Sequence, residues 1–449
     1  MMITNRSSAR IKRQRSQSGL SLIELLVAIA ISSIVILGLV TLINSIGVAN
    51  RAQDGLARLQ ENGRFAVQRI AADLRAATSQ HCASFDAASS ILNGVAGGSA
   101  IWVDVPRAPL MRFDAGANAA TRMGPVGIIP APDNPWYFMS TRFMMVGHEC
   151  DGAACIPATN APGRGVHRLG AALPAMGTGF GQRARGSDVL TLRYLSGAGV
   201  RVINRLQSGP PPVVDFFLEN NPAALARAGF TTMGNDPVWV SDCAGSEVFL
   251  GNLQAATVVR MAGANFNNGR VAGGLNLLSD ARAFHVPTSL RTVTYYLQLR
   301  EDPRNPGRTM SALMRKDGAA LAQELVEGVE RFDLLYGIND SQGRTSYLTA
   351  AQVDALVPAG GQCIGNNEPG CGWSAVKSVE IYLLTNTVDD VSPRGDDEFR
   401  YSWLNDGTAN AAGTFENPES LGTLRNGLPA GRMLRREFRT LINLRGYNY

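Results

Sequence analysis

Hydrophobic residues run almost without interruption near the start of the chain. Residues 20–46 read LSLIELLVAIAISSIVILGLVTLINSI, and Glu24 is the one charged residue among them. As a helix this stretch would be roughly 40 Å long, because each residue adds about 1.5 Å along the axis. A helix of that length crosses a bilayer with some tilt. The pattern therefore predicts a membrane-spanning helix over residues 20–50.

A different pattern follows in residues 51–80, where apolar residues recur at helical spacing. One face of this predicted helix carries the apolar and small residues Leu56, Leu59, Gly63, Ala66, Val67, Ile70 and Leu74. Polar residues occupy much of the rest, namely Arg58, Glu61, Arg64, Gln68, Arg69 and Asp73. Such an amphipathic helix is expected to dock its apolar stripe on the protein's own core.

The two segments are expected to form one helix, from about Leu20 to Thr78. No proline precedes Pro106, so nothing forces a break after the span. Four glycines lie inside this helix, and each costs about 1 kcal/mol relative to alanine. These glycines are Gly38, Gly47, Gly55 and Gly63. They indicate either bends in the helix or places of close packing, and both alternatives stay open at this point.

After residue 80 the pattern changes to short alternating segments separated by Gly, Pro, Asn and Asp, which is typical of strands joined by turns. The predicted strands are 101–105, 137–146, 188–194, 200–204, 292–299, 331–336, 376–384 and 437–444. The fold class is therefore α+β: a long N-terminal α-helix packed on a β-strand-rich globular head of residues 81–449. Two subdomains are an open alternative, with a division in 205–235, where a short helix or a long loop is expected.

The positive charge of the chain is concentrated at its beginning. Residues 1–19 contain no acidic residue and five basic ones, Arg6, Arg10, Lys12, Arg13 and Arg15. Removing these five charges from the formal net charge of +5 leaves zero for residues 20–449. A nucleic-acid-binding stripe is therefore not expected in the head. The basic block instead places residues 1–19 on the cytoplasmic side of the membrane.

Three interpretations of the span compete. A cleaved secretory signal has some support in Ala28-Ile29-Ala30, which looks like a small-residue cleavage site, but the apolar run continues beyond it. A plain transmembrane anchor explains the hydrophobicity and the charge bias. It leaves Glu24 unexplained, because a carboxylate in hydrocarbon is costly unless it is paired or lies near the interface.

The third interpretation comes from the string Ser18-Gly19-Leu20-Ser21-Leu22-Ile23-Glu24-Leu25-Leu26, which closely resembles the processing site of type IV prepilins. The resemblance implies that a membrane peptidase cleaves after Gly19 and methylates the new N-terminus, Leu20. Many pilins have Phe at this position, so Leu20 departs mildly from the pattern. Glu24 becomes the fifth residue of the mature chain, where family precedent pairs it with the N-terminal ammonium of a neighbouring subunit. Such a pair in a low dielectric sets subunit register.

Later segments resemble one pilin branch, the PilW-type minor pilins. The matching blocks follow one another in order between residues 19 and 445: 59–66, 73–75, 82, 187–194, 240–243, 325–330, 379–384 and 435–445. The resemblance implies a pilin-like fold and a scaffold role in priming or assembling type IV pili. It implies no enzymatic activity and no cofactor.

The same resemblance implies a location and a set of partners. Residues 1–19 would be a cleaved basic leader, and the mature chain would be a single-pass inner-membrane protein with a periplasmic head. It would then enter the pilus, with the tip and the cell surface as candidate places. The expected partners are other minor pilins, the major pilin, the prepilin peptidase and N-methyltransferase, the inner-membrane assembly platform and membrane lipid; no nucleic acid is expected.

Six cysteines indicate an oxidising compartment. Spacing favours the local pairs Cys150–Cys155 and Cys363–Cys371, which leaves Cys82 with Cys243. Six cysteines allow 15 connectivities, so the pairing stays open. The PilW-type resemblance adds support for Cys82–Cys243, because both cysteines fall in matching blocks, and such a bond would staple the end of the helix to the head.

Sharper chemistry finds little support in the sequence. His148, Glu149, Cys150 and Cys155 contain metal-ligand types, but an oxidising compartment favours a disulfide, and no metal site is expected. The acidic segments 339–343 and 389–390 with 396–398 lack EF-hand spacing, so calcium stays an open alternative only as a ligand of oxygen-rich loops. The four histidines, His81, His148, His167 and His285, lie in no recognisable nucleophile motif, so no catalytic residue is expected.

Two alternatives share the leader and Glu24. A pseudopilin of a type II secretion system would have the same anchor and a strand-rich head, although the size of this head and its PilW-like blocks favour the pilus. A pilus-tip adhesin would display a binding head on the same anchor. Normal piliation with lost binding in a head variant would favour the adhesin.

Overall fold

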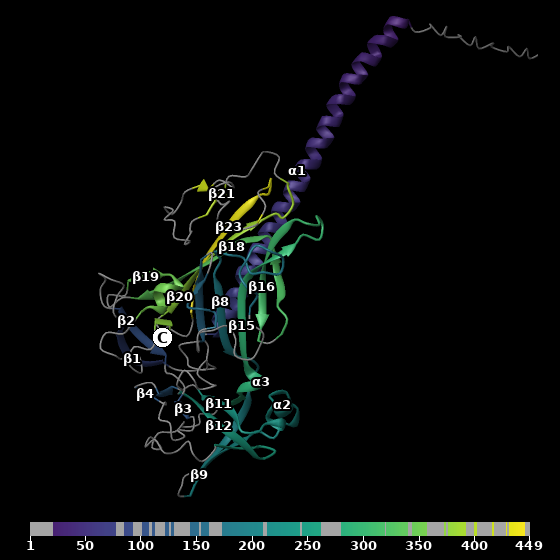
Figure 1. Cartoon of the computed structure of the whole chain (residues 1–449). Helices are drawn as coiled ribbons and strands as arrows, with labels where there is room; N and C mark the ends of the chain where they lie inside the picture. Colours follow the sequence, from purple (N-terminus) through teal and green to yellow (C-terminus); the bar gives the residue numbers. More distant parts are fainter. Residues whose placement is uncertain are drawn as a thin grey trace, which may run out of the picture. The chain divides into compact units, whose positions relative to one another are not determined.

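The computed structural model describes most of the N-terminal helix and the strands of the head (Figure 1). The described residues are 21–77, 85–92, 101–106, 110–112, 122–124, 127–129, 144–151, 154–160, 173–209, 213–242, 245–261, 280–318, 320–339, 344–356, 372–373, 376–391, 399–401, 415–416, 428 and 431–444. The chain divides into two units, Met1–Asp54 and Gly55–Tyr449.

Helix α1 runs from Leu22 to Ala77 and belongs to both units. It is one continuous helix, as the absence of proline predicts, and it passes through all four glycines. Its length and apolar composition are sufficient to cross a membrane. The fold class predicted from the sequence, a long apolar N-terminal helix with a strand-rich head, is confirmed.

The second unit contains a six-stranded antiparallel sheet in the order β17-β16-β15-β8-β6-β7. Its strands are β6 (Met145–Cys150), β7 (Cys155–Ile156), β8 (Val189–Leu195), β15 (Leu290–Glu301), β16 (Thr309–Asp317) and β17 (Gln323–Glu327). Successive side chains on a strand point to opposite faces. Tyr295 and Tyr296 therefore belong to different apolar clusters.

A four-stranded antiparallel sheet follows, in the order β19-β18-β20-β23. Its strands are β18 (Val329–Asn339), β19 (Thr345–Leu348), β20 (Val376–Asn386) and β23 (Arg435–Asn443). One large hydrophobic core joins both of these sheets to the last part of α1, through residues such as Ile70, Leu74, Leu297 and Phe332. The amphipathic half of the helix is therefore part of the core of the head.

A seven-stranded sheet has a hydrophobic cluster of its own, centred on Phe216, Phe249 and Val240. Its order is β11-β14-β9-β10-β13-β12-β3, with a further pairing of β11 with β12 and with β3 parallel to β12. Its strands are β3 (Leu110–Arg112), β9 (Val200–Ser208), β10 (Val213–Leu218), β11 (Asp236–Asp242), β12 (Gly245–Ala255), β13 (Val258–Met261) and β14 (Arg282–His285).

The remaining elements are short. The helices are α2 (Pro222–Arg227), η3 (Phe230–Thr232), α3 (Val286–Ser289) and α4 (Ala350–Asp354), and the strand pairs are β1 (Phe85–Leu92) with β2 (Ile101–Pro106), β4 (Arg122–Gly124) with β5 (Gly127–Ile129), and β21 (Phe399–Arg400) with β22 (Phe415–Glu416). Helix α4 begins with a capping box, in which Thr349 and Gln352 satisfy each other's backbone N–H groups.

Most predicted strands correspond to observed ones, with longer bounds. The strand predicted over 137–146 is partly wrong within the described residues, because β6 begins only at Met145 and extends to Cys150; positions 137–143 lie outside them. The expected helix or loop over 205–235 contains α2 and η3, but it also contains β10, which the sequence analysis missed. The division of the head into subdomains stays a prediction.

Candidate functional site

The processing segment begins just outside the described residues, which exclude Gly19 and Leu20. Glu24 lies in the first turn of α1, and its Oε2 accepts a hydrogen bond from the backbone N–H of Ser21 at 3.0 Å. An acidic side chain at a helix N-terminus is stabilised by the unpaired N–H groups there. The carboxylate therefore stays close to the N-terminal end of the helix.

The first unit exposes a continuous apolar surface. Every described residue from Ser21 to Thr41 is exposed, including Ile34 at 70%. An apolar surface of this extent is not stable in water. This surface must therefore be covered by something other than the described chain, either lipid or the helices of other subunits.

The second unit begins where Gly55 packs on the head. A Cβ at Gly55 would lie 3.2 Å from Val391 and 3.3 Å from Thr387, which belong to the turn after β20. In that turn Val388 has a φ of 60°, a left-handed conformation that β-branched residues rarely adopt. The side-chain oxygen of Asn386 accepts a hydrogen bond from the Val388 N–H at 2.8 Å and so supports it.

At Gly63, α1 comes very close to the four-stranded sheet. A Cβ there would lie 2.2 Å from the ring of Phe438 on β23. Only glycine leaves room for the ring at this distance. Gly38 and Gly47 have nothing within 4 Å of the same position. Of the two roles considered for the glycines, close packing therefore describes Gly55 and Gly63.

A polar cluster around the buried side chain of Asp73 fastens the end of α1 to the six-stranded sheet. Asp73 is only 5% exposed. Its Oδ2 accepts hydrogen bonds from Tyr295 Oη at 2.5 Å and from Arg315 Nε at 2.9 Å, and its Oδ1 accepts one from Tyr194 Oη at 3.2 Å. Arg69 lies one turn earlier, 3.8 Å away. We call Asp73, Tyr194, Tyr295 and Arg315 the helix anchor.

The pKa values of the anchor follow from its burial and from Asp73. Burial and then the negative charge of Asp73 raise the pKa of both Tyr295 and Tyr194, so both phenols stay protonated as donors. Burial alone would lower the pKa of Arg315, but its hydrogen bond to Asp73 and the attraction between the two charges outweigh that effect and raise it. Each donor is therefore held in the protonation state that the carboxylate requires.

Sequence reasoning placed Asp73 on the polar face of the helix, and this was wrong. Periodicity assigns a face from the helix alone, whereas the three partners of Asp73 lie 121, 222 and 242 residues further along the chain. The one sequence feature that could have indicated the burial of Asp73 is its position directly before Leu74, which belongs to the buried stripe. Tyr194, Tyr295 and Arg315 carried no signal of their own.

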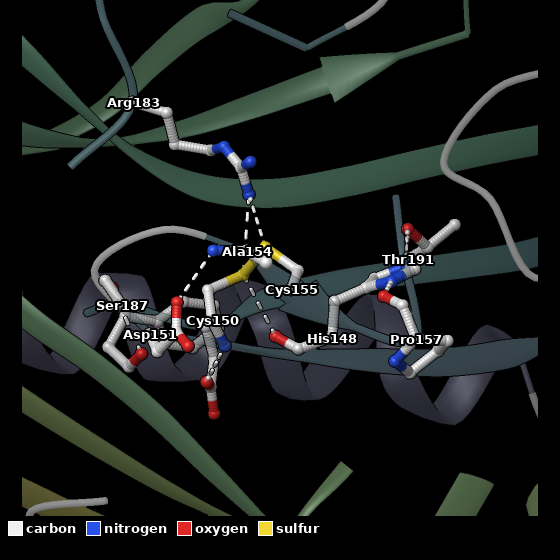
Figure 2. Close-up of a disulfide and its surroundings, with 11 residues drawn as sticks. His148, Cys150, Asp151, Ala154, Cys155, Pro157, Arg183, Ser187 and Thr191 are labelled. Carbon is white, nitrogen blue, oxygen red and sulfur yellow. Dashed lines mark hydrogen bonds between the residues drawn. A yellow bond between two sulfur atoms is a disulfide. The ribbon is translucent and has the colours of Figure 1, made fainter. Parts of the chain in front are cut away.

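One disulfide lies within the described residues and joins Cys150 to Cys155 (Figure 2). It is the local pair that the spacing favours, and the two cysteines face each other across the β6–β7 hairpin. Both sulfur atoms are therefore engaged with each other and unavailable as metal ligands. Cys82, Cys243, Cys363 and Cys371 lie outside the described residues, so their pairing stays a prediction.

The other candidate groups take part in local contacts. His148 is buried, with Nδ1 2.8 Å from the carbonyl oxygen of Pro157. His285 is 2.8 Å from the hydroxyl of Thr288. Asp389 and Asp390 form ion pairs with Arg304 and Arg308. In the part of the chain that the structure describes, no three metal-ligand side chains converge. His81, His167 and positions 340–343 and 396–398 lie outside it.

Two family models match the chain. Residues 14–40 match the prokaryotic N-terminal methylation motif, and residues 294–446 match the type IV pilus-assembly protein W family. The first match contains Gly19, Leu20 and Glu24. The second contains Tyr295, Arg315 and Phe438, which contact α1. No curated protein and no solved structure matches the chain.

Proposed function

The chain is a PilW-type minor pilin that takes part in type IV pilus assembly, and from this premise we propose how its first residues bring it into the pilus. The prepilin peptidase cleaves after Gly19, and the same machinery methylates Leu20. The support for these positions is the basic leader before Gly19 and the apolar run after it, both of which lie in or beside the matched motif.

Glu24 sets the position of the subunit in the assembling filament. Its carboxylate pairs with the methylated N-terminal ammonium of a neighbouring pilin. An unpaired charge in a low dielectric is costly, so only one register between the two helices satisfies both groups. The position of Glu24 in the first turn of α1 supports this role.

The head acts on the outer side of the inner membrane. Residues 1–19 are basic and remain cytoplasmic, which directs the head into the periplasm. The disulfide between Cys150 and Cys155 agrees with an oxidising compartment. From there the subunit joins other minor pilins in a complex that primes the pilus and ends at its tip.

The role is that of a scaffold. Both matched families consist of pilus structural and assembly proteins. The observation that carries the proposal is the contrast within α1, whose first unit exposes apolar side chains and whose last turns are fastened to the head through Asp73. A helix built in this way can insert into lipid or into a filament while the head keeps its fold.

The first test is the intact mass of the membrane-extracted protein, with and without the prepilin peptidase. We expect a chain that begins at Leu20, is heavier by one methyl group and is lighter by two hydrogens for each disulfide. Without the peptidase, residues 1–19 should remain. A chain that keeps those residues in the presence of the peptidase contradicts the proposal.

A second test separates register from processing. The Glu24→Ala variant should be cleaved normally but should no longer support pilus assembly. The measurement is the number of pili per cell, counted by electron microscopy in a strain whose piliation depends on this subunit. Glu61→Ala is the matched control, because Glu61 is an exposed glutamate on the same helix. Equal piliation in the two variants rules out the register role.

A further inference from the structure

The disulfide Cys150–Cys155 lies at an edge of the six-stranded sheet, in a small cluster of its own. Val189, Tyr296, Ala312 and Met314 surround it on the face of the sheet that carries Tyr296. Both cysteines are largely buried, Cys150 at 3% and Cys155 at 9% exposed. Strand β7 is the last strand of the sheet, and its Cys155 is the more exposed of the two residues.

A buried arginine points at this disulfide. The guanidinium Nη1 of Arg183 lies 3.2 Å from Cys155 Sγ and 3.5 Å from Cys150 Sγ. Figure 2 draws both contacts as dashed lines. Arg183 is 6% exposed, and its Nε has no hydrogen-bond partner. Within the described part of the chain, its guanidinium forms no ion pair with a carboxylate. Burial lowers the pKa of Arg183, and the nearby Tyr296 opposes this only in part.

This arrangement leaves a desolvated cation against two neutral sulfur atoms. A buried charge is costly unless an opposite charge compensates it. A disulfide provides only weak acceptors, whereas a thiolate would provide a full negative charge. The environment therefore suits the reduced pair better than it suits the oxidised pair.

We propose that Cys150–Cys155 is a site of thiol–disulfide exchange whose reduced form is stabilised by Arg183, with dithiol and disulfide oxidoreductases as the class of reactant. A thiolate of the dithiol attacks the Sγ of Cys155, the more exposed of the two residues. The bond to Cys150 breaks, and Cys150 leaves as a thiolate facing the guanidinium. The second thiol of the reagent then attacks the reagent's first sulfur, which is bonded to Cys155 in the mixed disulfide. This step closes the reagent's disulfide and releases Cys155.

The step balances in atoms and electrons. Two electrons pass from the dithiol to the pair, and the dithiol becomes a disulfide. Of the two protons that the dithiol loses, one binds to Cys155 and the other goes to solvent, while Cys150 keeps its negative charge beside Arg183. The reduced pair therefore takes up one proton instead of two. Oxidation by a disulfide reagent reverses the same steps.

Other ionisable groups face the hairpin and bear on its pH dependence. Asp188 accepts a hydrogen bond from the Cys150 N–H at 3.3 Å, and burial raises its pKa well above the ordinary value. Burial also raises the pKa of Glu149. Both carboxyls therefore hold a proton, and lack the charge that would oppose a thiolate, over a wider pH range than usual. Asp151 and His148 belong to the same hairpin segment, and Tyr296 to β15.

The test equilibrates the full-length protein in detergent with dithiothreitol redox buffers, traps thiols by alkylation and reads Cys150 and Cys155 by peptide mass spectrometry. Peptide readout keeps the other four cysteines out of the measurement. Arg183→Met should lower the ratio of the reduced to the oxidised cysteine pair about tenfold at the same potential. This is the effect expected if Arg183 stabilises the Cys150 thiolate by about one pKa unit. Arg183→Lys should retain most of the ratio. Arg185→Met, an exposed arginine two residues away, should leave it unchanged.

The pH dependence provides a readout that a purely structural role would not move. In the unsubstituted protein the midpoint potential should change with pH less steeply than in Arg183→Met, because one proton fewer is taken up. Alkylation of the reduced pair in the unsubstituted protein should also persist to lower pH than that of an ordinary thiol, a measurement that requires no variant to fold. Equal ratios in the unsubstituted protein and Arg183→Met, or an ordinary alkylation profile, overturn the proposal.

Discussion

The two parts of α1 obtain their stability from different sources. From Leu22 to Asp54 no described residue is buried, and the exposed side chains are mostly Leu, Ile and Val. From Gly55 to Ala77 the helix buries Leu59, Gly63, Ile70 and Leu74, and it ends on the helix anchor. The first part requires surroundings that the described chain does not supply, and the second part is completed by its own head.

The difference shows how one helix serves both a membrane and a core. An apolar surface on all sides suits lipid or a bundle of similar helices. A helix with one apolar stripe and one buried carboxylate accepts a single docking position, because the carboxylate must reach its donors. Substitutions in the second part should therefore alter head stability, and matched substitutions in the first part should not.

The largest effect is expected from the helix anchor. Asp73→Ala removes the acceptor of Tyr194, Tyr295 and Arg315. The half-buried Arg315 then loses the nearer of its two carboxylates and keeps Asp317, 3.9 Å away. The free energy of unfolding of the head should fall by about 4 kcal/mol, measured by urea denaturation in detergent. Asp54→Ala, an exposed position on the same helix, should change it by less than about 0.5 kcal/mol. Similar losses in both variants contradict the anchor.

Two isoleucines provide a test of packing alone. Ile70 is fully buried and Ile34 is 70% exposed. Ile70→Ala should destabilise the head by about 3 kcal/mol, because it loses apolar burial and leaves a cavity. Ile34→Ala should leave the unfolding midpoint of the head unchanged. A head that responds equally to both substitutions is inconsistent with the division of α1 into two parts.

Two glycines test close approach. Gly63→Ala places a Cβ against the ring of Phe438 and should cost the head about 2 kcal/mol from overpacking. Gly38→Ala meets nothing and should raise helix stability by up to about 1 kcal/mol, measured by circular dichroism. The double variant Gly63→Ala with Phe438→Leu should recover part of the loss. If Gly63→Ala alone is neutral, the ring does not determine the approach.

The smallest effect expected is a pH dependence confined to the head. Burial, then the charges of Asp333 and Glu149, raise the pKa of Asp188 well above the ordinary value. The folded state then binds this proton more tightly than the unfolded state does. The resulting stability is fully present below the ordinary carboxyl pKa of about 4. It is lost as the pH rises through the raised value.

Unfolding midpoints measured between acidic and neutral pH should therefore decrease as the pH rises. Asp188→Asn should flatten this dependence, because it removes the titrating group. Asp54→Asn should leave the dependence as it is. A dependence of equal slope in Asp188→Asn assigns it to other groups, of which Glu149, whose pKa burial also raises, is the next candidate.

Strand prediction succeeded where the segment is typical of strands by itself. Segments 188–194, 292–299 and 376–384 fall almost entirely within β8, β15 and β20. The sequence pattern did not predict β16, because its central residues from Met310 to Met314 are all buried and show no regular polar alternation. Most of the seven-stranded sheet was not predicted either, because short apolar runs between turns do not reveal whether they pair.

By itself the sequence determined the properties that depend on local order: the basic leader, the apolar span, Glu24 within it and the amphipathic stripe after it. Charge bias and helical periodicity act over a few turns, so one sequence is enough to interpret them. Tertiary structure alone decided that Asp73 is buried, that Gly63 admits the ring of Phe438 and that Arg183 faces the disulfide. In the first two contacts the partners lie more than a hundred residues apart, and in the third Arg183 is 28 residues from Cys155. Only the folded chain brings these groups together, and their burial there sets the cost of leaving them unpaired.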